Sequence, residues 1–175
     1  MEFKLLNAAE VEQHRAAFLE MLREADSDFV PPLSQRFAPK DKSTEKEGTE
    51  NGILRYFESM KKEQILAALE GGELLGFVTF VRDLSCHGID KSTFPNLYIG
   101  TLIVRRAARG RGVTRQMYTY LFDALCPACS LFTRTWSTNM AHISILQKFG
   151  FGEIARLAND RGEGIDTVYF GKVRH

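Results

Sequence analysis

Cysteine and tryptophan are scarce in this sequence, which has three cysteines and one tryptophan among 175 residues. A small and odd number of cysteines argues against the disulfide framework that holds many secreted domains together. No apolar run approaches the length that crosses a bilayer, and Met1 to Glu10 shows no signal-peptide pattern. We therefore expect a cytoplasmic protein that has no membrane partner.

An excess of charge of one sign is also missing, because 23 lysine and arginine residues face 22 acidic residues and the formal net charge is +1. The molecule as a whole should have little attraction for nucleic acid, so a polyanion would need a local basic patch. The proportions of hydrophobic residues, 44%, and charged residues, 26%, are those of a folded globular protein. A chain of this length fits one domain, and we expect a single domain over residues 1–175.

Hydrophobic periodicity predicts alternating strands and helices, with Gly71-Gly72 as the turn of a hairpin. The predicted strands are Phe3–Leu6, Gln64–Glu70, Leu74–Leu84, Leu97–Val104, Ser130–Trp136, Phe151–Asn159 and Ile165–Val173. The predicted helices are Glu10–Ala25, Ile53–Met60 with Asn51 as its cap, one that begins near Gly112, and Asn139–Phe149. This order indicates an α/β (α+β) fold, in which a mixed sheet has helices on both faces.

The segment from Asp26 to Asn51 follows neither periodicity and contains prolines and a charged run, Lys40 to Glu50. A loop of this length in a compact domain is usually either functional or without fixed structure. Its acidic residues would suit a cationic amine, but its lysines nearly cancel their charge. Two interpretations therefore stay open, a cover over an acceptor site and a solvated loop.

The most informative segment runs from Val104 to Thr114, where an apolar strand enters a glycine-containing loop that opens into an amphipathic helix. The first N–H groups of a helix have no intrahelical acceptor, and the helix dipole is positive there. Gly110 and Gly112 let the backbone turn tightly and approach a bulky anion. Such a junction suits a phosphate or pyrophosphate. Five arginines would add a local basic patch: Arg105, Arg106, Arg109, Arg111 and Arg115.

Neither of two common phosphate-binding motifs matches this segment, since the spacing of the dinucleotide fingerprint and the ending of the P-loop are both missing. The segment Arg109-Gly-Arg-Gly112-Val-Thr114 instead resembles the signature Arg/Gln-x-x-Gly-x-Gly/Ala of the GNAT superfamily of acyl-CoA-dependent N-acyltransferases. Val104 precedes it at the family's spacing, and Asn139 and Gly150-Phe151 match a later helix of the family. Thr114 departs from the signature.

The resemblance implies a mostly antiparallel sheet of six to seven strands that is splayed between two central strands, with acetyl-CoA as co-substrate and no metal. It also implies the transfer of an acetyl group to a primary amine, on a small molecule or a peptide, by direct attack. We leave open whether the protein is a homodimer. The implied cofactor contacts are the backbone of Leu102, Ile103 and Val104 for the pantetheine arm, the amides of Arg109, Gly110, Arg111, Gly112, Val113 and Thr114 for the pyrophosphate, and the Asn139 side chain for the pantetheine or thioester.

The same resemblance does not identify the acid and the base. Many family members protonate the leaving thiolate with a tyrosine seven residues after the asparagine, and here that residue is Leu146. Members that acetylate protein N-termini often have a glutamate five residues before the asparagine, and here it is Arg134. His142, one helical turn after the asparagine, is the nearest substitute, and Tyr98 and Thr101 are further candidates. Each of the three could instead be an ordinary core residue.

Three further interpretations follow from single features of the sequence. The missing tyrosine leaves open a sensor domain that binds acyl-CoA without turnover. Cys126-Pro-Ala-Cys129 has the spacing of a redox pair, but it follows a helix rather than opening one and has no second ligand pair, so we expect ordinary thiols. Trp136 and Arg134 end a strand, where either could line the acceptor pocket or pack in the core.

Overall fold

The computed structural model describes residues 1–37 and 48–174. They form two compact units. Unit 1 contains Met1–Thr79 and Thr101–Thr114, and unit 2 contains Phe80–Gly100 and Arg115–His175. The chain therefore crosses from one unit to the other inside its longer strands and inside one helix. The single domain that the length predicts stays a prediction.

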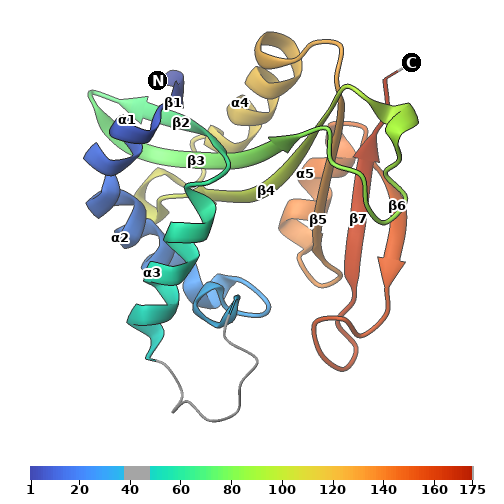
Figure 1. The fold of residues 1–175 in the computed structure, drawn as a ribbon, viewed down its shortest axis with the longest axis horizontal. Helices are drawn as coiled ribbons and strands as arrows, with labels where there is room; N and C mark the ends of the chain where they lie inside the picture. The colour runs from blue at the N-terminus through green and yellow to red at the C-terminus, as the bar shows by residue number, and fades with distance from the viewer. Residues whose placement is uncertain (38–47, 175) are drawn as a thin grey trace. The chain divides into compact units, whose positions relative to one another are not determined.

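Seven strands follow one another in the hydrogen-bonded order β1-β2-β3-β4-β5-β7-β6 (Figure 1). The central strands β4 (Asn96–Val104) and β5 (Ser130–Trp136) pair in parallel, whereas β5 pairs antiparallel with β7 (Thr167–Lys172) and β7 with β6 (Gly152–Leu157). The predicted mixed, mostly antiparallel sheet with helices is confirmed. Each predicted strand is present, with ends that differ by at most a few residues.

In unit 1, β1 (Glu2–Leu6) pairs antiparallel with β2 (Gln64–Glu70), and a two-residue turn leads from β2 into β3 (Glu73–Arg82). Gly71 and Gly72 have φ values of 58° and 85°, the positive values that a two-residue hairpin turn requires. The predicted hairpin is confirmed. Seven consecutive residues of β3, Leu74 to Phe80, are buried, as expected for a strand inside a sheet.

Three α-helices belong to unit 1: α1 (Ala8–Gln13), α2 (Arg15–Ala25) and α3 (Thr49–Met60). The single helix predicted from Glu10 to Ala25 is wrong, because His14 (φ −92°, ψ 9°) departs from helical geometry and separates α1 from α2. Asn7 and Glu10 close a reciprocal capping box at the start of α1.

The segment predicted to contain neither helix nor strand holds two short 3₁₀ helices, η1 (Asp26–Asp28) and η2 (Leu33–Gln35), before α3 begins. The N-cap of α3 is Gly48, so the prediction of Asn51 as the cap is wrong and Asn51 lies within the helix. The prolines and lysines of this segment that fall between residues 38 and 47, with Glu45 and Glu47, lie outside the described residues.

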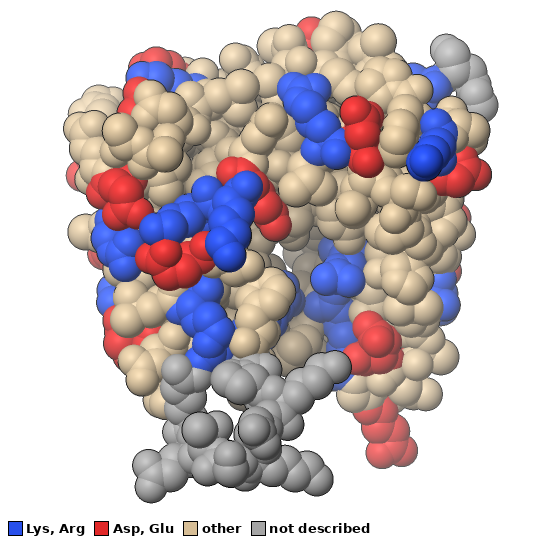
Figure 2. All heavy atoms as spheres, in the orientation of Figure 1, with Lys and Arg blue, Asp and Glu red and all other residues tan. Residues whose placement is uncertain are grey.

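Charged side chains on the surface of unit 1 are interleaved rather than separated by sign, as Figure 2 shows over its helices. Glu12 and Glu58 each bind both Arg15 and Lys61, at N–O distances from 2.6 to 3.2 Å. Both cations also lie over the ring of Phe57. This four-residue network covers the apolar core at the outer side of α1, α2 and α3.

Unit 2 contains most of α4 (Val113–Tyr120), a π-helical turn η5 (Leu121–Leu125) and α5 (Met140–Lys148). Rings of Tyr118, Phe122, Phe149 and Phe151 pack together with centroids 5.3 to 6.0 Å apart. Gly150 has a φ of 80° just after α5, so it ends this helix as predicted.

Cys126 and Cys129 follow η5 and form a disulfide, with their Cα atoms 5.3 Å apart. The prediction of ordinary thiols at these positions is therefore wrong. Cys129 is buried, and a guanidinium nitrogen of Arg82 lies 3.9 Å from the Sγ atom of Cys126. The pair closes the connection between η5 and β5.

Candidate functional site

The predicted phosphate loop lies in unit 1, between the end of β4 and the start of α4. After Val104 the chain makes a 3₁₀ turn, η4 (Arg106–Ala108), and then passes Gly110 and Gly112, whose φ values are 78° and 74°. The helix begins at Val113, so the amides of its first turn have no acceptor within the helix. No described atom lies within 4 Å of where a Cβ at Gly110 would stand. The loop therefore presents backbone rather than side chains to a ligand.

Close packing against β3 holds this loop in place. A Cβ on Gly76 would lie 3.1 Å from the carbonyl oxygen of Ile103 and 3.3 Å from side-chain atoms of both Val104 and Val113. Only a glycine lets β3 come so near to the strand end and the helix start at once. The amide of Arg105 also donates to the carbonyl of Leu75 at 2.8 Å. These contacts fix the backbone from which the loop departs.

Four of the five arginines that the sequence suggests as a basic patch, those other than Arg115, have carboxylate partners in the same unit, so these four are not a free basic patch. Arg105 pairs with Glu20, Arg109 with Asp28 and Arg111 with Glu70, at 3.0, 2.8 and 2.7 Å, and Arg106 lies 3.8 Å from Asp28. These acids cancel much of the local charge. Affinity for an anion at this loop would therefore depend on the backbone amides and the helix terminus.

Arg109 has a structural role as well. Its Nε atom donates to the carbonyl of Val104 at 3.3 Å while its Nη2 atom binds Asp28. The side chain thus joins the beginning of the loop to its glycine segment and to η1. A substitution of Arg109 would loosen the loop itself, in addition to any loss of charge.

The backbone of β4 beyond Ile99 is the predicted contact for a pantetheine arm. The ladder between β4 and β5 runs from Asn96↔Ser130 to Ile99↔Thr133 and stops there, whereas β4 continues to Val104. The ladder between β4 and β5 therefore does not include Leu102, Ile103 or Val104.

Thr101 is buried and fully engaged within unit 1. Its amide donates to the Oγ1 atom of Thr79 at 2.9 Å, and its hydroxyl shares a hydrogen bond of 2.5 Å with the hydroxyl of Tyr56 on α3. These contacts are those of a residue that fixes β4 against β3 and α3. A direct catalytic part for Thr101 stays a prediction.

In unit 2, Asn139 is the N-cap of α5. Its Oδ1 atom accepts the amide of His142 at 3.3 Å, and its Nδ2 atom donates to the hydroxyl of Thr135 at 3.0 Å. An amide NH₂ group has two hydrogens, and the described residues take only one of them. The second is available to a ligand, so the predicted contact of Asn139 with pantetheine stays a prediction that this geometry permits.

His142 is mostly buried, and its Nε2 atom lies 2.8 Å from the hydroxyl of Tyr118. Burial lowers the pKa of His142 to about 4, so the imidazole is neutral at pH 7. Burial likewise raises the pKa of the Tyr118 hydroxyl, which keeps its proton. Leu146, at the position where the resemblance implies a tyrosine, is fully buried. Sequence reasoning missed Tyr118, because nothing in its own segment indicates a partner 24 residues away.

Tyr98 lies on β4 in unit 2 and is partly buried. Burial raises the pKa of its hydroxyl, and the nearby positive charge of Arg134 opposes that effect. Arg134 in turn donates to the hydroxyl of Tyr169 at 3.3 Å. The guanidinium of Arg161 lies 5.7 Å from the ring of Trp136, which is also partly buried. The structure thus brings Tyr98 and Arg134 together with Tyr169, a residue that the sequence did not single out.

The fold and the phosphate loop agree with those that the resemblance to the GNAT superfamily implies. The chain matches the Acetyltransferase (GNAT) family over residues 19–151 and belongs to that family. The predicted family is therefore confirmed. The matched range includes the phosphate loop, Asn139, His142 and Gly150-Phe151.

Solved structures of the same fold include a ribosomal-protein-alanine N-acetyltransferase from Brucella melitensis, with a TM-score of 0.64, 17% identity and coverage of 99% of both chains. An N-acetyltransferase from Staphylococcus aureus Mu50 has a TM-score of 0.66 and 19% identity, over 98% of this chain and 97% of that one. The yncA protein from Salmonella typhimurium, solved with its cofactor acetyl-CoA, has a TM-score of 0.63 and 19% identity, over 100% and 94%. At these identities the likeness shows the fold alone.

Among curated proteins, none matches this chain significantly. Within residues 1–37 and 48–174, no helix is both long enough and apolar enough to cross a membrane. The same residues contain no group of three or more histidine, cysteine, aspartate or glutamate side chains placed to hold a metal ion.

Proposed function

We propose that this protein is an N-acetyltransferase that moves the acetyl group of acetyl-CoA to a primary amine on a small molecule or a peptide. Membership of the GNAT family supports acyl transfer, and a fold shared with a protein solved with acetyl-CoA supports that co-substrate. The observation that carries the proposal is the segment Arg109 to Thr114. There two glycines with positive φ lead directly into the open N-terminus of α4.

The residues of this segment fit a diphosphate. Anions bind at helix N-termini because amides converge there and the helix dipole is positive. In this proposal the amides from Arg109 to Thr114 hold the pyrophosphate, and the backbone of Leu102, Ile103 and Val104 holds the pantetheine arm. Thr114 keeps its amide although its side chain departs from the family signature.

The acceptor must lose a proton before it attacks. For an alkylamine with a pKa near 10.4 this costs roughly 4–5 kcal/mol at neutral pH. A group with a pKa of about 4 takes that proton poorly, so His142 is not the general base in this proposal. The amine instead loses its proton to bulk solvent at equilibrium before it attacks, and the free energy given above is the cost of that equilibrium. Acetyl-CoA supplies a thioester whose thiol has a pKa of about 8.5, so the leaving group needs little help from an acid.

His142 and Tyr98 then act as hydrogen-bond donors. If the hydroxyl of Tyr118 donates to Nε2, the neutral imidazole of His142 carries its hydrogen on Nδ1 and presents a donor of fixed direction. Tyr98 keeps its proton because burial raises its pKa. Thr101 positions β4 through its bonds to Thr79 and Tyr56.

The buried leucine at position 146 supports a second candidate function, a domain that binds acyl-CoA as a sensor without turnover. One pair of measurements separates the two candidates. Calorimetry with CoA and acetyl-CoA reports binding, and release of free thiol from acetyl-CoA with a panel of amines reports turnover. A transferase gives both signals, whereas a sensor gives heat and no thiol.

Gly110→Ala tests the loop. The variant places a methyl group where the diphosphate is proposed to bind, and it should weaken CoA binding at least ten-fold. Gly71→Ala is the matched control, because Gly71 also has a positive φ and open space around it but lies in the β2–β3 turn. Equal CoA affinities for both variants and the wild type would contradict the proposed site.

A further inference from the structure

One face of β4, β5 and β7 in unit 2 carries a set of polar side chains, and there the ring of His87 packs against buried Tyr169 with centroids 4.9 Å apart. In the ladders Tyr98 lies opposite Phe132, and Arg134 lies opposite Tyr169. Because side chains alternate along a strand and opposed residues share a face, Tyr98, Arg134 and Tyr169 point the same way. Thr135 points the other way, toward Asn139 at the start of α5. In Figure 1, α5 lies behind β5.

Arg134 has far fewer partners than its five N–H donors could serve. It donates once, to the hydroxyl of Tyr169, and no carboxylate of the described residues lies within 4 Å of it. Arg156 in the same unit is the opposite case, since it binds both Glu153 and Asp166 at 2.8 Å. The guanidinium of Arg134 therefore retains the planar pair of donors that binds a carboxylate in the bidentate manner.

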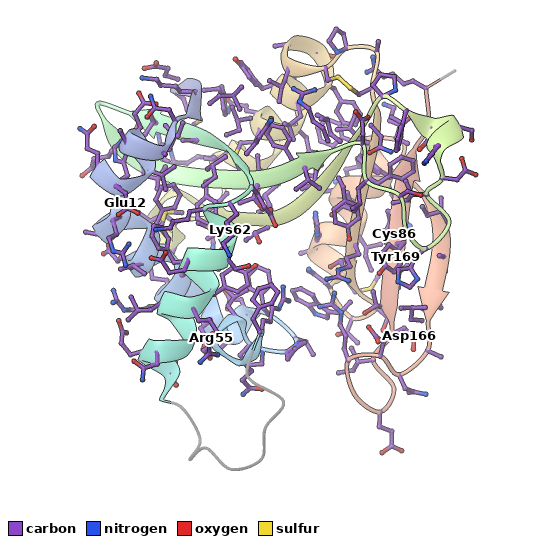
Figure 3. All side chains as sticks on the ribbon, viewed as in Figure 1. Glu12, Arg55, Lys62, Cys86, Asp166 and Tyr169 are labelled. Atoms are coloured by element: carbon purple, nitrogen blue, oxygen red, sulfur yellow. A yellow bond between two sulfur atoms is a disulfide. The ribbon has the colours of Figure 1, made fainter. Side chains whose placement is uncertain are left out.

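Charges of both signs lie around Arg134. Arg161 acts with Arg134 on the pKa of Tyr98, so both guanidinium groups lie near that hydroxyl. Asp160 lies near enough to act electrostatically on Arg134, and it accepts a hydrogen bond from Thr167 at 2.6 Å. Asp166, labelled in Figure 3 nearer than Tyr169 to the turn between β6 and β7, is held by Arg156.

We propose that the acceptor is an amino acid, a primary amine that carries a carboxylate, and that Arg134 binds this carboxylate. The proposal rests on the proposed function. In the transfer the amine nitrogen forms the new C–N bond to the acetyl carbon and the C–S bond of the thioester breaks. The nitrogen loses a proton to water, and the thiolate leaves. The side chain of Tyr98, which is partly buried, lies on the side of the sheet that carries Arg134 and suits the carbon chain of such an acceptor.

The experiment compares amino acids with the amines that they give on decarboxylation, so that each pair differs only in the carboxylate. Wild-type protein should show a kcat/KM at least ten-fold higher for the amino acid of the preferred pair. Arg134→Gln should raise the KM for that amino acid at least ten-fold, abolish the preference and leave the KM for acetyl-CoA unchanged. Arg134→Lys keeps the positive charge but loses the planar pair of donors. Its KM and its preference for the amino acid should therefore lie between those of the wild type and of Arg134→Gln.

Arg156→Gln is the control, an arginine of the same unit that is held by two carboxylates, and it should keep the wild-type preference. A preference for the decarboxylated amine, or an unchanged KM in Arg134→Gln, would overturn the inference while the transferase proposal stands. If neither the amino acids nor their decarboxylated amines cause release of thiol from acetyl-CoA, the proposed function is overturned as well. Circular dichroism and melting temperature establish that each variant is folded. If Arg134→Gln does not fold, the same comparison of KM and preference is made with Arg134→Lys.

Discussion

Mild acid should destabilise this protein through one histidine. His142 is mostly buried against Tyr118, and burial lowers its pKa from 6.5 to about 4. In the unfolded chain the imidazole regains its ordinary pKa. Between these two values the unfolded state binds a proton that the folded state excludes, so stability rises with pH in this window and falls as the pH drops through 6.5 toward 4.

The size of the effect follows from the two pKa values. Linkage gives a loss in the free energy of unfolding of about 2 kcal/mol at pH 5 and about 3 kcal/mol at pH 4, with almost none at pH 7. Domains of this kind are stable by about 5–15 kcal/mol, so the loss is a large share of the total. Carboxylates in ion pairs add their own losses at low pH, and a variant is needed to separate them.

His142→Gln supplies that comparison, because glutamine does not titrate and its side-chain oxygen can still accept from Tyr118. Urea unfolding at pH 7, 6, 5 and 4 gives the free energy of each protein, and the difference between wild type and variant should shift by about 2–3 kcal/mol across the series. His14→Gln, a histidine of unit 1, is the control. A constant difference between wild type and His142→Gln would refute the burial argument and would restore His142 as a candidate base.

Two further variants test the packing and the charge of unit 1. Gly52→Ala should destabilise the protein by about 1–3 kcal/mol in urea, although alanine is the better helix former, because its Cβ would stand 2.1 Å from the carbonyl oxygen of Ser34. Gly48→Ala, which has open space, should change stability by less than about 0.5 kcal/mol. Asp28→Asn removes a negative charge that is paired with Arg109, and calorimetry at low salt should show CoA binding about two- to five-fold tighter, an effect that shrinks in high salt.

Most strands and the phosphate loop could be predicted because their signals are local. An apolar run, two adjacent glycines or a glycine-rich loop before a helix needs no distant partner to be recognised. The helix boundaries were harder. The break at His14 has no proline or glycine to mark it, and the capping box of Asn7 and Glu10 lies at the other end of a helix of only six residues. Gly48 caps α3 from inside a charged run that suggests a loop.

The chemistry of the site depended on contacts between distant segments, and these could not be read from spacing. Arg109 and its partner Asp28 are 81 residues apart, and Arg111 and Glu70 are 41 apart. A run of arginines with no acid beside it therefore looks like a free basic patch in the sequence, whereas the fold neutralises it. The bond between Cys126 and Cys129 is close in sequence, yet the same spacing is compatible with free thiols.

None of the catalytic candidates among the described residues is a base with a pKa near neutrality. The position of Arg134 therefore matters for reactivity as well as for binding. The carboxylate of an amino acid stabilises its own ammonium group and so raises the pKa of the amine that must be deprotonated. A guanidinium that pairs with this carboxylate cancels that attraction, and its positive charge also disfavours the ammonium form directly. Both effects lower the pKa of the bound amine, and each unit of that shift removes about 1.4 kcal/mol from the cost of deprotonation. Arg134 would therefore favour the neutral amine by lowering its pKa, whereas His142, which is neutral and buried, does not remove the proton as a base.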